Sequence, residues 1–250
     1  MAQMQELTRG EHRWDYTASI PEVMRSLNDL VASGKVNYLG ISDTPAWIVS
    51  KANQYARDNG LRQFVVYQGM WNAGMRDFER DIIPMCINEG MGLCPYGVLG
   101  QGRFQTKQGY EEREKNPEGR NFIPLSEHDR SVSRHLEKIA NRKGCQLLDV
   151  ALQYVMQKTP YVFAIVGGRK VSHIEGNIEA LKVALSDEDI AEVEKAYDFD
   201  PGFPHTFLSG SLFNGDANDN KGGYSAQDVW LLKGLGTTDY VESARSIRPA

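Results

Sequence analysis

The chain has 250 residues, of which 41% are hydrophobic, and a formal net charge of -5 from interspersed acidic and basic residues. A mixed, mildly acidic composition gives no reason to expect a nucleic acid or an anionic membrane as partner. The three cysteines, Cys86, Cys94 and Cys145, show no CxxC spacing, which argues against a disulfide framework or a zinc site. No apolar run approaches the roughly 18 residues needed to span a bilayer, and residues 1–11 lack the apolar region of a signal peptide, so we expect a cytoplasmic protein.

Helical and strand patterns alternate from Ser19 onward. Ser19 is a candidate N-cap, followed by Pro21 in the first turn and Glu22 three residues later, and Gly34 closes this helix. The next patterns predict, in chain order, a strand over 36–42, a helix over 45–58, a strand over 64–68, a helix over 78–89, and a third strand with its outgoing loop over 92–98.

The second half of the chain opens with a polar stretch, 101–128, which is too long for an ordinary loop between a strand and a helix and is therefore predicted to be functional or mobile. The patterns after it predict two helices over 131–158 with a break near Lys143-Gly144, a fourth strand over 163–168, a helix over 172–181, and a helix that begins at Ser186 with an acidic first turn. From Phe199 the pattern dissolves into Gly, Asn, Asp and Ser, with one apolar stretch at 229–232.

These elements predict three segments: an amino-terminal segment and loop over 1–18, a body of βα units over 19–198, and a carboxyl-terminal extension over 199–250. Strands that alternate with helices indicate parallel strands covered on both sides. Four βα units make half of an eight-stranded barrel, so the predicted fold is α/β, an incomplete (half) TIM barrel with two open edges. We expect a homodimer, most simply a twofold one, to cover those edges.

Polar residues gather where the predicted parallel strands end, which is where ligands bind in such folds. They are Ser42-Asp43, Gln68 and Asn72, Tyr96 with 97–101, and 167–170. Amides, hydroxyls, an aromatic face, glycines and two cations suit an anionic aromatic ligand such as a dinucleotide. No GxGxxG or Walker A sequence occurs, which argues against a Rossmann or P-loop site.

Several segments resemble the aldo-keto reductase family, in particular its fungal branch of aryl-alcohol dehydrogenases and norsolorinic acid reductase. They are HRWDY, SIPEVMRSLNDLVASGKVNYLGISD, FVVYQGMWNA, CPYGVLGQGRF and IVGGRKVSHIEGNIEAL, in continuous order from His12 to about Phe203. The resemblance implies the carboxyl-terminal half of a TIM barrel and NADP(H)-dependent reduction of a small-molecule aldehyde or ketone, in secondary metabolism.

The same resemblance implies a role for individual residues at the nicotinamide end of the cofactor. Ser42 and Gln68 would hold the carboxamide, and Tyr96 would stack on the ring. These three residues follow or end predicted strands, as the strand-end argument requires.

At the other end of the cofactor, the resemblance implies contacts with phosphate and adenine. The backbone around Gly97 to Leu99, with Gln101, would approach the pyrophosphate. Arg169 and Lys170 would meet the adenosine phosphates, and Asn177 the adenine. Two cations at the phosphates favour NADP(H) over NAD(H).

The family reduces a carbonyl with an Asp, Tyr, Lys and His tetrad, in which Tyr is the general acid and His orients the carbonyl. His12 matches the histidine, and it is the predicted catalytic residue. The Asp-x-Ala-x-x-Tyr-Gly pattern of the family occurs nowhere in the 250 residues, and the Tyr96-Gly97 pair belongs to the nicotinamide motif instead. We therefore expect an amino-terminally truncated family member with an impaired tetrad.

Three functions remain open on these observations. The first is an NADP(H)-dependent oxidoreductase acting on a carbonyl or alcohol. The second is a cofactor-independent enzyme, such as an isomerase, dehydratase or cyclase, that reuses the old pocket. The third is a pseudoenzyme that binds NADP(H) or a protein partner without turnover.

Overall fold

The computed structural model describes residues 14–115, 125–205 and 244–249, and these form two compact units that are described separately. Within those residues, unit 1 comprises 14–70, Asp81–Tyr96 and Tyr161–Ile165, and unit 2 comprises Trp71–Arg80, Gly97–Pro160 and the residues from Val166 onward. His12 and the apolar stretch 229–232 lie outside the described residues. None of the helices in the described part of the chain is long and apolar enough to cross a membrane.

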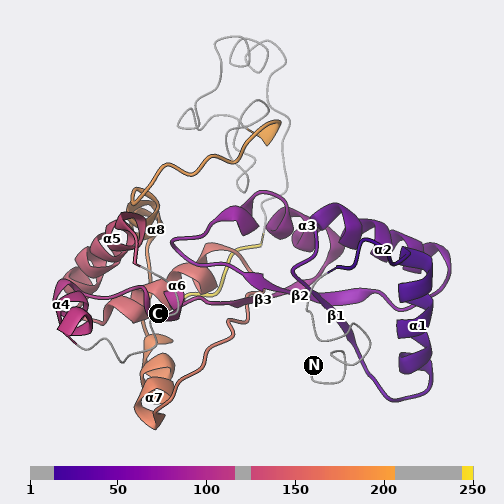
Figure 1. The fold of residues 1–250 in the computed structure, drawn as a ribbon, viewed down its shortest axis with the longest axis horizontal. Coiled ribbons are helices and arrows are strands. Elements are labelled where there is room, and N and C mark those ends of the chain that lie inside the picture. The colour runs from indigo at the N-terminus through magenta and orange to yellow at the C-terminus, as the bar shows by residue number, and fades with distance from the viewer. Residues whose placement is uncertain (1–13, 116–124, 206–243, 250) are drawn as a thin grey trace. The chain divides into compact units, whose positions relative to one another are not determined.

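Unit 1 contains a parallel sheet and three helices (Figure 1). Its elements in chain order are α1 (Ile20–Ala32), β1 (Leu39–Ser42), α2 (Ala46–Asp58), β2 (Phe64–Met70), α3 (Ile82–Glu89) and β3 (Gly92–Tyr96). The strands lie in the order β1-β2-β3, and both strand pairs are parallel, which confirms the predicted parallel α/β arrangement. The register pairs Ser42 with Gln68 and Met70 with Tyr96, so the three strands end at the same edge.

The predicted fourth strand, 163–168, is wrong as a full strand. The segment does run parallel beside β3, since the N–H of Leu93 donates to Tyr161 (2.9 Å) and the N–H of Phe163 donates to Leu93 (2.7 Å). The N–H of Ile165 then donates to the carbonyl of Pro95 (2.8 Å). Pro95 has no N–H that could donate a hydrogen bond to the neighbouring segment. The ladder is therefore interrupted at Pro95, and only an isolated bridge remains.

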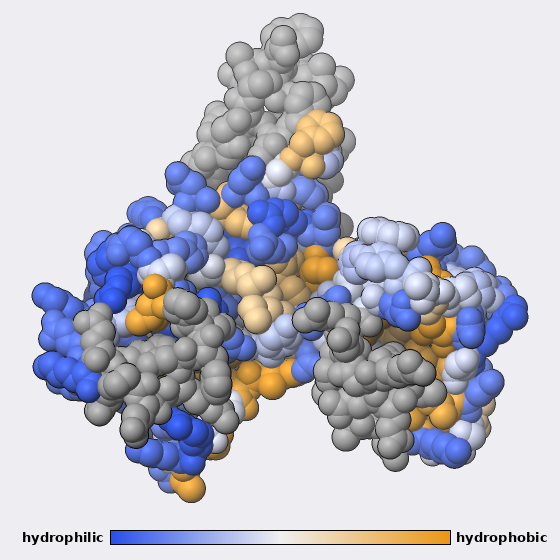
Figure 2. Space-filling model, in the orientation of Figure 1, coloured by the Kyte–Doolittle hydropathy of each residue, from blue (hydrophilic) through white to orange (hydrophobic). Residues whose placement is uncertain are grey.

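Helix α1 begins and ends where its local sequence predicts. Ser19 caps α1 by accepting a hydrogen bond from the N–H of Glu22 (3.3 Å), and Gly34 follows the helix at a φ of 73°. The sheet and helices are joined by Asn53 of α2, whose side chain donates to and accepts from the backbone of Phe64, at 3.1 and 2.9 Å. Hydrophobic residues are visible at parts of the surface in Figure 2. The exposed large hydrophobic side chains of unit 1 include Tyr38 and Val65.

The predicted helix 78–89 is wrong as a single helix. A 3₁₀ turn, η2 (Asp77–Glu79), precedes α3, which starts only at Ile82. Pro84 explains the break, because its ring would collide with the carbonyl of Arg80 if the helix extended back through that residue. A proline is tolerated only in the first turn of a helix, and α3 therefore begins just before it.

Unit 2 is helical (Figure 1). Besides η2, its elements are η3 (Gly100–Gly102), α4 (Lys107–Lys115), α5 (Glu127–Lys143), α6 (Leu147–Lys158), α7 (Val171–Ala180) and α8 (Asp187–Glu194). The break between α5 and α6 is confirmed, and Gly144 sits there at a φ of 68°. The predicted N-cap at Ser186 is also confirmed, with a reciprocal capping box to Asp189.

The polar stretch 101–128 contains more regular structure than predicted. It includes η3 and α4, and α5 begins within it at Glu127. The buried side chain of Tyr110 explains the order of α4, because its hydroxyl donates to the carbonyl of Arg103 (2.7 Å) and lies 2.7 Å from Ser133 Oγ. A single aromatic residue thus anchors a helix whose other positions are mostly polar. The predicted segments 1–18, 19–198 and 199–250 stay a prediction.

Candidate functional site

Three predicted site residues come together at the carboxyl edge of the sheet in unit 1. Ser42 ends β1, Tyr96 ends β3, and Gln68 lies on β2 in register with Ser42. Asp43 connects them, since its carboxylate accepts from Ser42 Oγ (3.2 Å) and from the Tyr96 hydroxyl (3.3 Å to each oxygen). Its N–H donates to the carbonyl of Gln68 (3.0 Å). The parallel sheet therefore presents a hydroxyl, an amide, a carboxylate and a phenol ring at one edge.

The turn after β1 is held in place by Tyr67, which sequence reasoning did not single out. The Tyr67 hydroxyl donates to the carbonyl of Thr44 (2.7 Å) and accepts from its N–H (2.9 Å). Burial raises the pKa of Tyr67 well above its usual value, so the hydroxyl keeps its proton as a donor. These two hydrogen bonds hold the turn in which Asp43 has a φ of 43°, a left-handed backbone conformation that residues other than glycine adopt rarely.

The predicted pyrophosphate segment, Gly97 to Gln101, forms a tight turn in unit 2. Gly97 and Gly100 have φ values of 69°, and Gln101 has a φ of 53°. The N–H of Gly100 donates to the carbonyl of Gly97 (2.9 Å), which closes the turn around Val98 and Leu99. Glycine is required here because the backbone is left-handed at both ends of the turn. The side-chain amide of Asn72 also donates to the carbonyl of Gly97 (3.1 Å).

Arg169 and Lys170 precede the first turn of α7, in unit 2. Both side chains are exposed, and neither forms an ion pair with a carboxylate in 14–115, 125–205 or 244–249. Lys170 is the N-cap residue of α7, and no side chain caps that helix end. Two unpaired cations at a helix amino terminus favour the approach of an anion.

Asn177 lies on α7, and its Nδ2 atom is buried without a hydrogen-bond partner in the described residues. A buried amide donor that is left unsatisfied costs roughly 1–3 kcal/mol, so such groups usually meet a ligand or water. A ring nitrogen of adenine is an acceptor of the right kind. The orphaned donor therefore fits the role that the sequence implied for Asn177.

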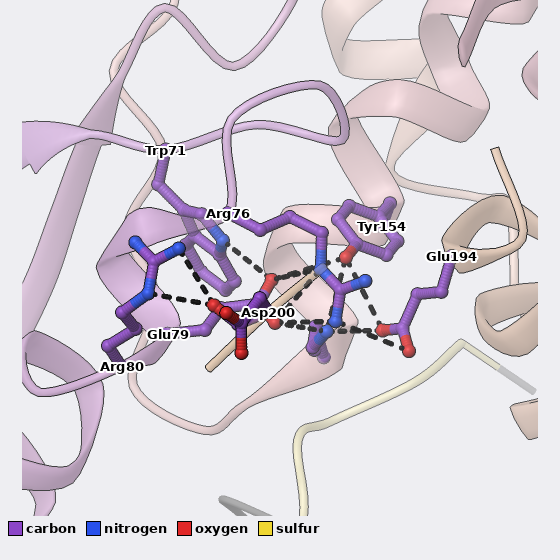
Figure 3. Close-up of polar contacts among 8 residues, drawn as sticks. Trp71, Arg76, Glu79, Arg80, Tyr154, Glu194 and Asp200 are labelled. Carbon is purple, nitrogen blue, oxygen red and sulfur yellow. Dashed lines mark hydrogen bonds and ion pairs between the residues drawn. The ribbon is translucent and has the colours of Figure 1, made fainter. Parts of the chain in front are cut away.

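Sequence reasoning missed a buried charge cluster in unit 2 (Figure 3). Glu79 is at its centre and is fully buried. It accepts hydrogen bonds from Trp71 Nε1 (3.1 Å), from Arg76 Nη2 (2.9 Å) and from Lys158 Nζ (2.7 Å). Glu194 of α8 forms ion pairs with both Arg76 and Lys158.

Glu79 keeps its negative charge despite its burial. Burial acts to raise the pKa of Glu79, but the charge of Lys158 and the hydrogen bonds from Arg76 outweigh it and hold the pKa below its usual value. Burial raises the pKa of neighbouring Tyr154 far above its usual value. Each charged group thus has an opposite partner, which is the arrangement of a structural cluster.

Comparisons with known proteins identify the family. The profile of the aldo/keto reductase family matches residues 11–198. Norsolorinic acid reductase B of Aspergillus parasiticus is 67% identical over 240 residues, covering 95% of this chain and 62% of that protein. The aryl-alcohol dehydrogenase (NADP(+)) of Phanerodontia chrysosporium is 51% identical over 211 residues, covering 81% of this chain and 55% of that protein. The chain therefore spans less than two thirds of these relatives.

A solved structure agrees with the family match. A thermostable aldo-keto reductase, crystallised with the inhibitor epalrestat, has a TM-score of 0.58 to this chain at 21% sequence identity. The likeness covers 73% of this chain and 57% of the other, and at this identity it shows a shared fold. The profile match over residues 11–198, which is more than half of the chain, shows that the chain belongs to the aldo/keto reductase family.

Proposed function

We propose that this chain binds NADP(H) and serves the reduction of an aldehyde or ketone, or the reverse oxidation of an alcohol, in fungal secondary metabolism. The observation that carries the proposal is the convergence of Ser42, Gln68 and Tyr96 at one edge of the parallel sheet. Support also comes from relatives named norsolorinic acid reductase and aryl-alcohol dehydrogenase.

The groups in unit 1 suit a nicotinamide. The Tyr96 ring offers a flat apolar face for stacking. The amide of Gln68 and the hydroxyl of Ser42 offer a donor and an acceptor for the carboxamide. The carboxylate of Asp43, which accepts from Ser42 and Tyr96, adds an acceptor for the carboxamide NH₂.

The groups in unit 2 suit the rest of the dinucleotide. The turn from Gly97 to Gln101 would bring backbone N–H groups to the pyrophosphate, with Leu99 at its centre. Arg169 and Lys170 would neutralise the adenosine phosphates, and their lack of carboxylate partners in the described residues leaves that charge available. An additional phosphate on the ribose gives these cations a second anion, which favours NADP(H) over NAD(H).

The chemistry has two parts. When bound, the nicotinamide supplies a hydride to the carbonyl carbon or accepts one from an alcohol, and a protein acid or base exchanges the proton at oxygen. His12, which lies outside the described residues, would orient the carbonyl. The pattern that carries the family's Asp and Tyr is not among the 250 residues, so we assign the proton donor to none of them.

A second candidate is a pseudoenzyme that binds NADP(H) without turnover. Both candidates require that the chain binds NADP(H), and a fluorescence titration of the purified chain with NADPH tests this. We expect saturable binding that is weakened by Arg169→Ala and by Tyr96→Ala. Lys182→Ala is the matched control, because Lys182 is an exposed cation that already pairs with Glu179 (2.6 Å).

Each outcome of the titration has a meaning. No saturation up to millimolar NADPH would refute cofactor binding and leave the cofactor-independent enzyme to be tested. Binding with consumption of NADPH in the presence of an aromatic aldehyde supports the reductase. Binding without consumption over a panel of aldehydes and ketones supports the pseudoenzyme. The homodimer and the cytoplasmic location stay predictions.

A further inference from the structure

Asn72 is a buried polar residue that lies two positions beyond the end of β2, in unit 2. Its side chain makes two hydrogen bonds: Nδ2 donates to the carbonyl of Gly97 (3.1 Å), and Oδ1 accepts from the N–H of Gly74 (2.9 Å). Its backbone pairs in both directions with Met75, at 3.2 and 3.0 Å. Backbone and side chain are therefore both fixed, and the amide points to Gly97.

The Gly97 carbonyl accepts two hydrogen bonds, one from the N–H of Gly100 (2.9 Å) and one from Asn72. The first bond belongs to the turn itself, whereas the second comes from a loop 25 residues earlier in the chain. Because the peptide unit is planar and trans, a carbonyl held toward Asn72 turns the N–H of Val98 the opposite way. The hydrogen bond that closes the turn is donated by the N–H of Gly100, so the N–H groups of Val98 and Leu99 take no part in it.

The ring of Phe104 packs the same two loops together. A Cβ added at Gly100 would lie 2.7 Å from this ring, and one added at Gly74 would lie 3.4 Å from it. Phe104 is itself buried, with 1% of its surface exposed. The Asn72 amide and the Phe104 ring thus join the loop after β2 to the turn after β3.

The loop that contains Asn72 is anchored at its other end in the buried charge cluster. Glu79 accepts from the indole of Trp71 (3.1 Å), the residue immediately before Asn72, and from Arg76 (Figure 3). A fully buried carboxylate with these donors leaves the loop little freedom to move. Asn72 is therefore presented to Gly97 from a rigid segment.

We infer that Asn72 is a positioning residue for dinucleotide binding: it fixes the Gly97 peptide so that the turn presents N–H groups, and not a carbonyl oxygen, to the pyrophosphate. This inference rests on the proposed binding of NADP(H). Glycine at position 97 has a wide choice of backbone angles, and the bond from the Gly100 N–H holds its carbonyl from within the turn alone. Asn72 adds a second bond to the same carbonyl from a rigid loop outside the turn, and so makes this orientation of the peptide the stable one.

Asn72→Asp is the most specific substitution. It keeps the size of the side chain and the acceptor for the Gly74 N–H, but it replaces the donor with an oxygen that faces the Gly97 carbonyl. Asn59→Asp is the matched control, because Asn59 Nδ2 also donates to a backbone carbonyl, that of Tyr55 (2.9 Å), at the exposed end of α2. The two ligands are NADPH and adenosine 2′,5′-bisphosphate, which lacks the pyrophosphate.

We expect Asn72→Asp to weaken NADPH binding on the order of tenfold, which is about 1.4 kcal/mol, and to leave binding of adenosine 2′,5′-bisphosphate within about twofold. Asn59→Asp changes neither affinity. If Asn72 had a purely structural role, Asn72→Asp would weaken the binding of both ligands by a similar factor. That result would overturn the inference, and so would unchanged NADPH binding. Thermal unfolding confirms that each variant is folded; if Asn72→Asp is not, Asn72→Ser, which retains a hydroxyl donor, is measured with the same two ligands.

The inference and the proposed function fail in different ways. If the unsubstituted chain binds NADPH and Arg169→Ala weakens it while Asn72→Asp does not, then the inference alone is wrong. If the unsubstituted chain binds neither ligand, then the proposed function is wrong and the inference falls with it.

Discussion

Lys158 and Glu79 form an ion pair in the interior of unit 2, with 2.7 Å between Lys158 Nζ and Glu79 Oε2. Their side chains are 7% and 0% exposed. The pair ties the last residue of α6 to the 3₁₀ turn η2, across 79 positions of sequence. Because removing Glu79 would leave the cations of Arg76 and Lys158 with Glu194 as their shared carboxylate, this contact matters more than the exposed ion pairs do.

We expect Glu79→Gln to lower the free energy of unfolding by about 3 kcal/mol, because Arg76 and Lys158 would lose their shared buried partner. Urea denaturation followed by circular dichroism measures the change. Glu179→Gln is the control, since its pair with Lys182 is exposed and should contribute little. Equal effects of the two substitutions would contradict the importance assigned to the cluster.

Asp189 makes stability depend on pH. Burial acts to raise its pKa, but hydrogen bonds from Lys143, from the Ser186 backbone N–H and from Arg142 lower the pKa to about 2. A carboxylate whose pKa is lower in the folded state than in the unfolded chain stabilises the fold at pH values above its usual pKa of 3.8. That contribution is lost as the pH falls through about 2.

The thermal midpoint should therefore decrease as the pH is lowered from 4 to 2. Asp189→Asn should make this dependence of the midpoint on pH less steep. Scanning calorimetry at several pH values compares the two chains. An identical slope in Asp189→Asn would show that other carboxylates account for the acid sensitivity.

Gly100→Ala should be more destabilising than Gly102→Ala. Both glycines have positive φ values, 69° and 84°, so each substitution incurs backbone strain of about 1 kcal/mol. The new methyl group at position 100 would also lie 2.7 Å from the Phe104 ring, whereas the one at 102 meets nothing within 4 Å. Overpacking adds roughly 1–3 kcal/mol, which thermal or urea unfolding can resolve. Equal losses would mean that Phe104 moves aside at no cost.

Tyr96→Phe and Tyr96→Ala should separate the ring of Tyr96 from its hydroxyl. The ring supplies the proposed stacking surface, so Tyr96→Ala should weaken NADPH binding by about tenfold or more. The bonds from the hydroxyl to Asp43 are long, 3.3 Å to each oxygen, so Tyr96→Phe should stay within about threefold of the unsubstituted chain. Fluorescence titration gives both affinities, and similar losses would assign the role to the hydroxyl instead.

We expect the chain to form a homodimer. In the part of the chain that the structure describes, β1 has β2 as its single strand neighbour, and Tyr38 beside it is 79% exposed. Unpaired strand edges associate unless they are covered or charged. Sedimentation velocity should show a dimer at micromolar concentration, and Tyr38→Lys should shift it toward monomer. A monomer at all concentrations would refute the expectation.

The sequence by itself determined the features that depend on neighbouring residues. Ser19 and Ser186 begin helices because their hydroxyls reach N–H groups three residues on, and Gly34 and Gly144 follow helices because they adopt positive φ. Apolar runs such as Phe64–Met70 determined the strands and, with the helices between them, their parallel order. The family segments also indicated Ser42 and Tyr96, which the Asp43 carboxylate connects in the structure.

The tertiary structure decided what depends on residues far apart in the chain. Pro95 interrupts the ladder between β3 and the segment Tyr161–Ile165, because its missing N–H matters only once the two segments are side by side. The sequence indicated Asn72 only as one of several polar residues near strand ends, and it did not indicate Glu79. In the structure Asn72 holds the Gly97 carbonyl, and Glu79 holds a buried pair of cations. A local pattern cannot reveal such roles, because hydrogen bonds and ion pairs gain their strength from burial, and burial is a property of the folded chain.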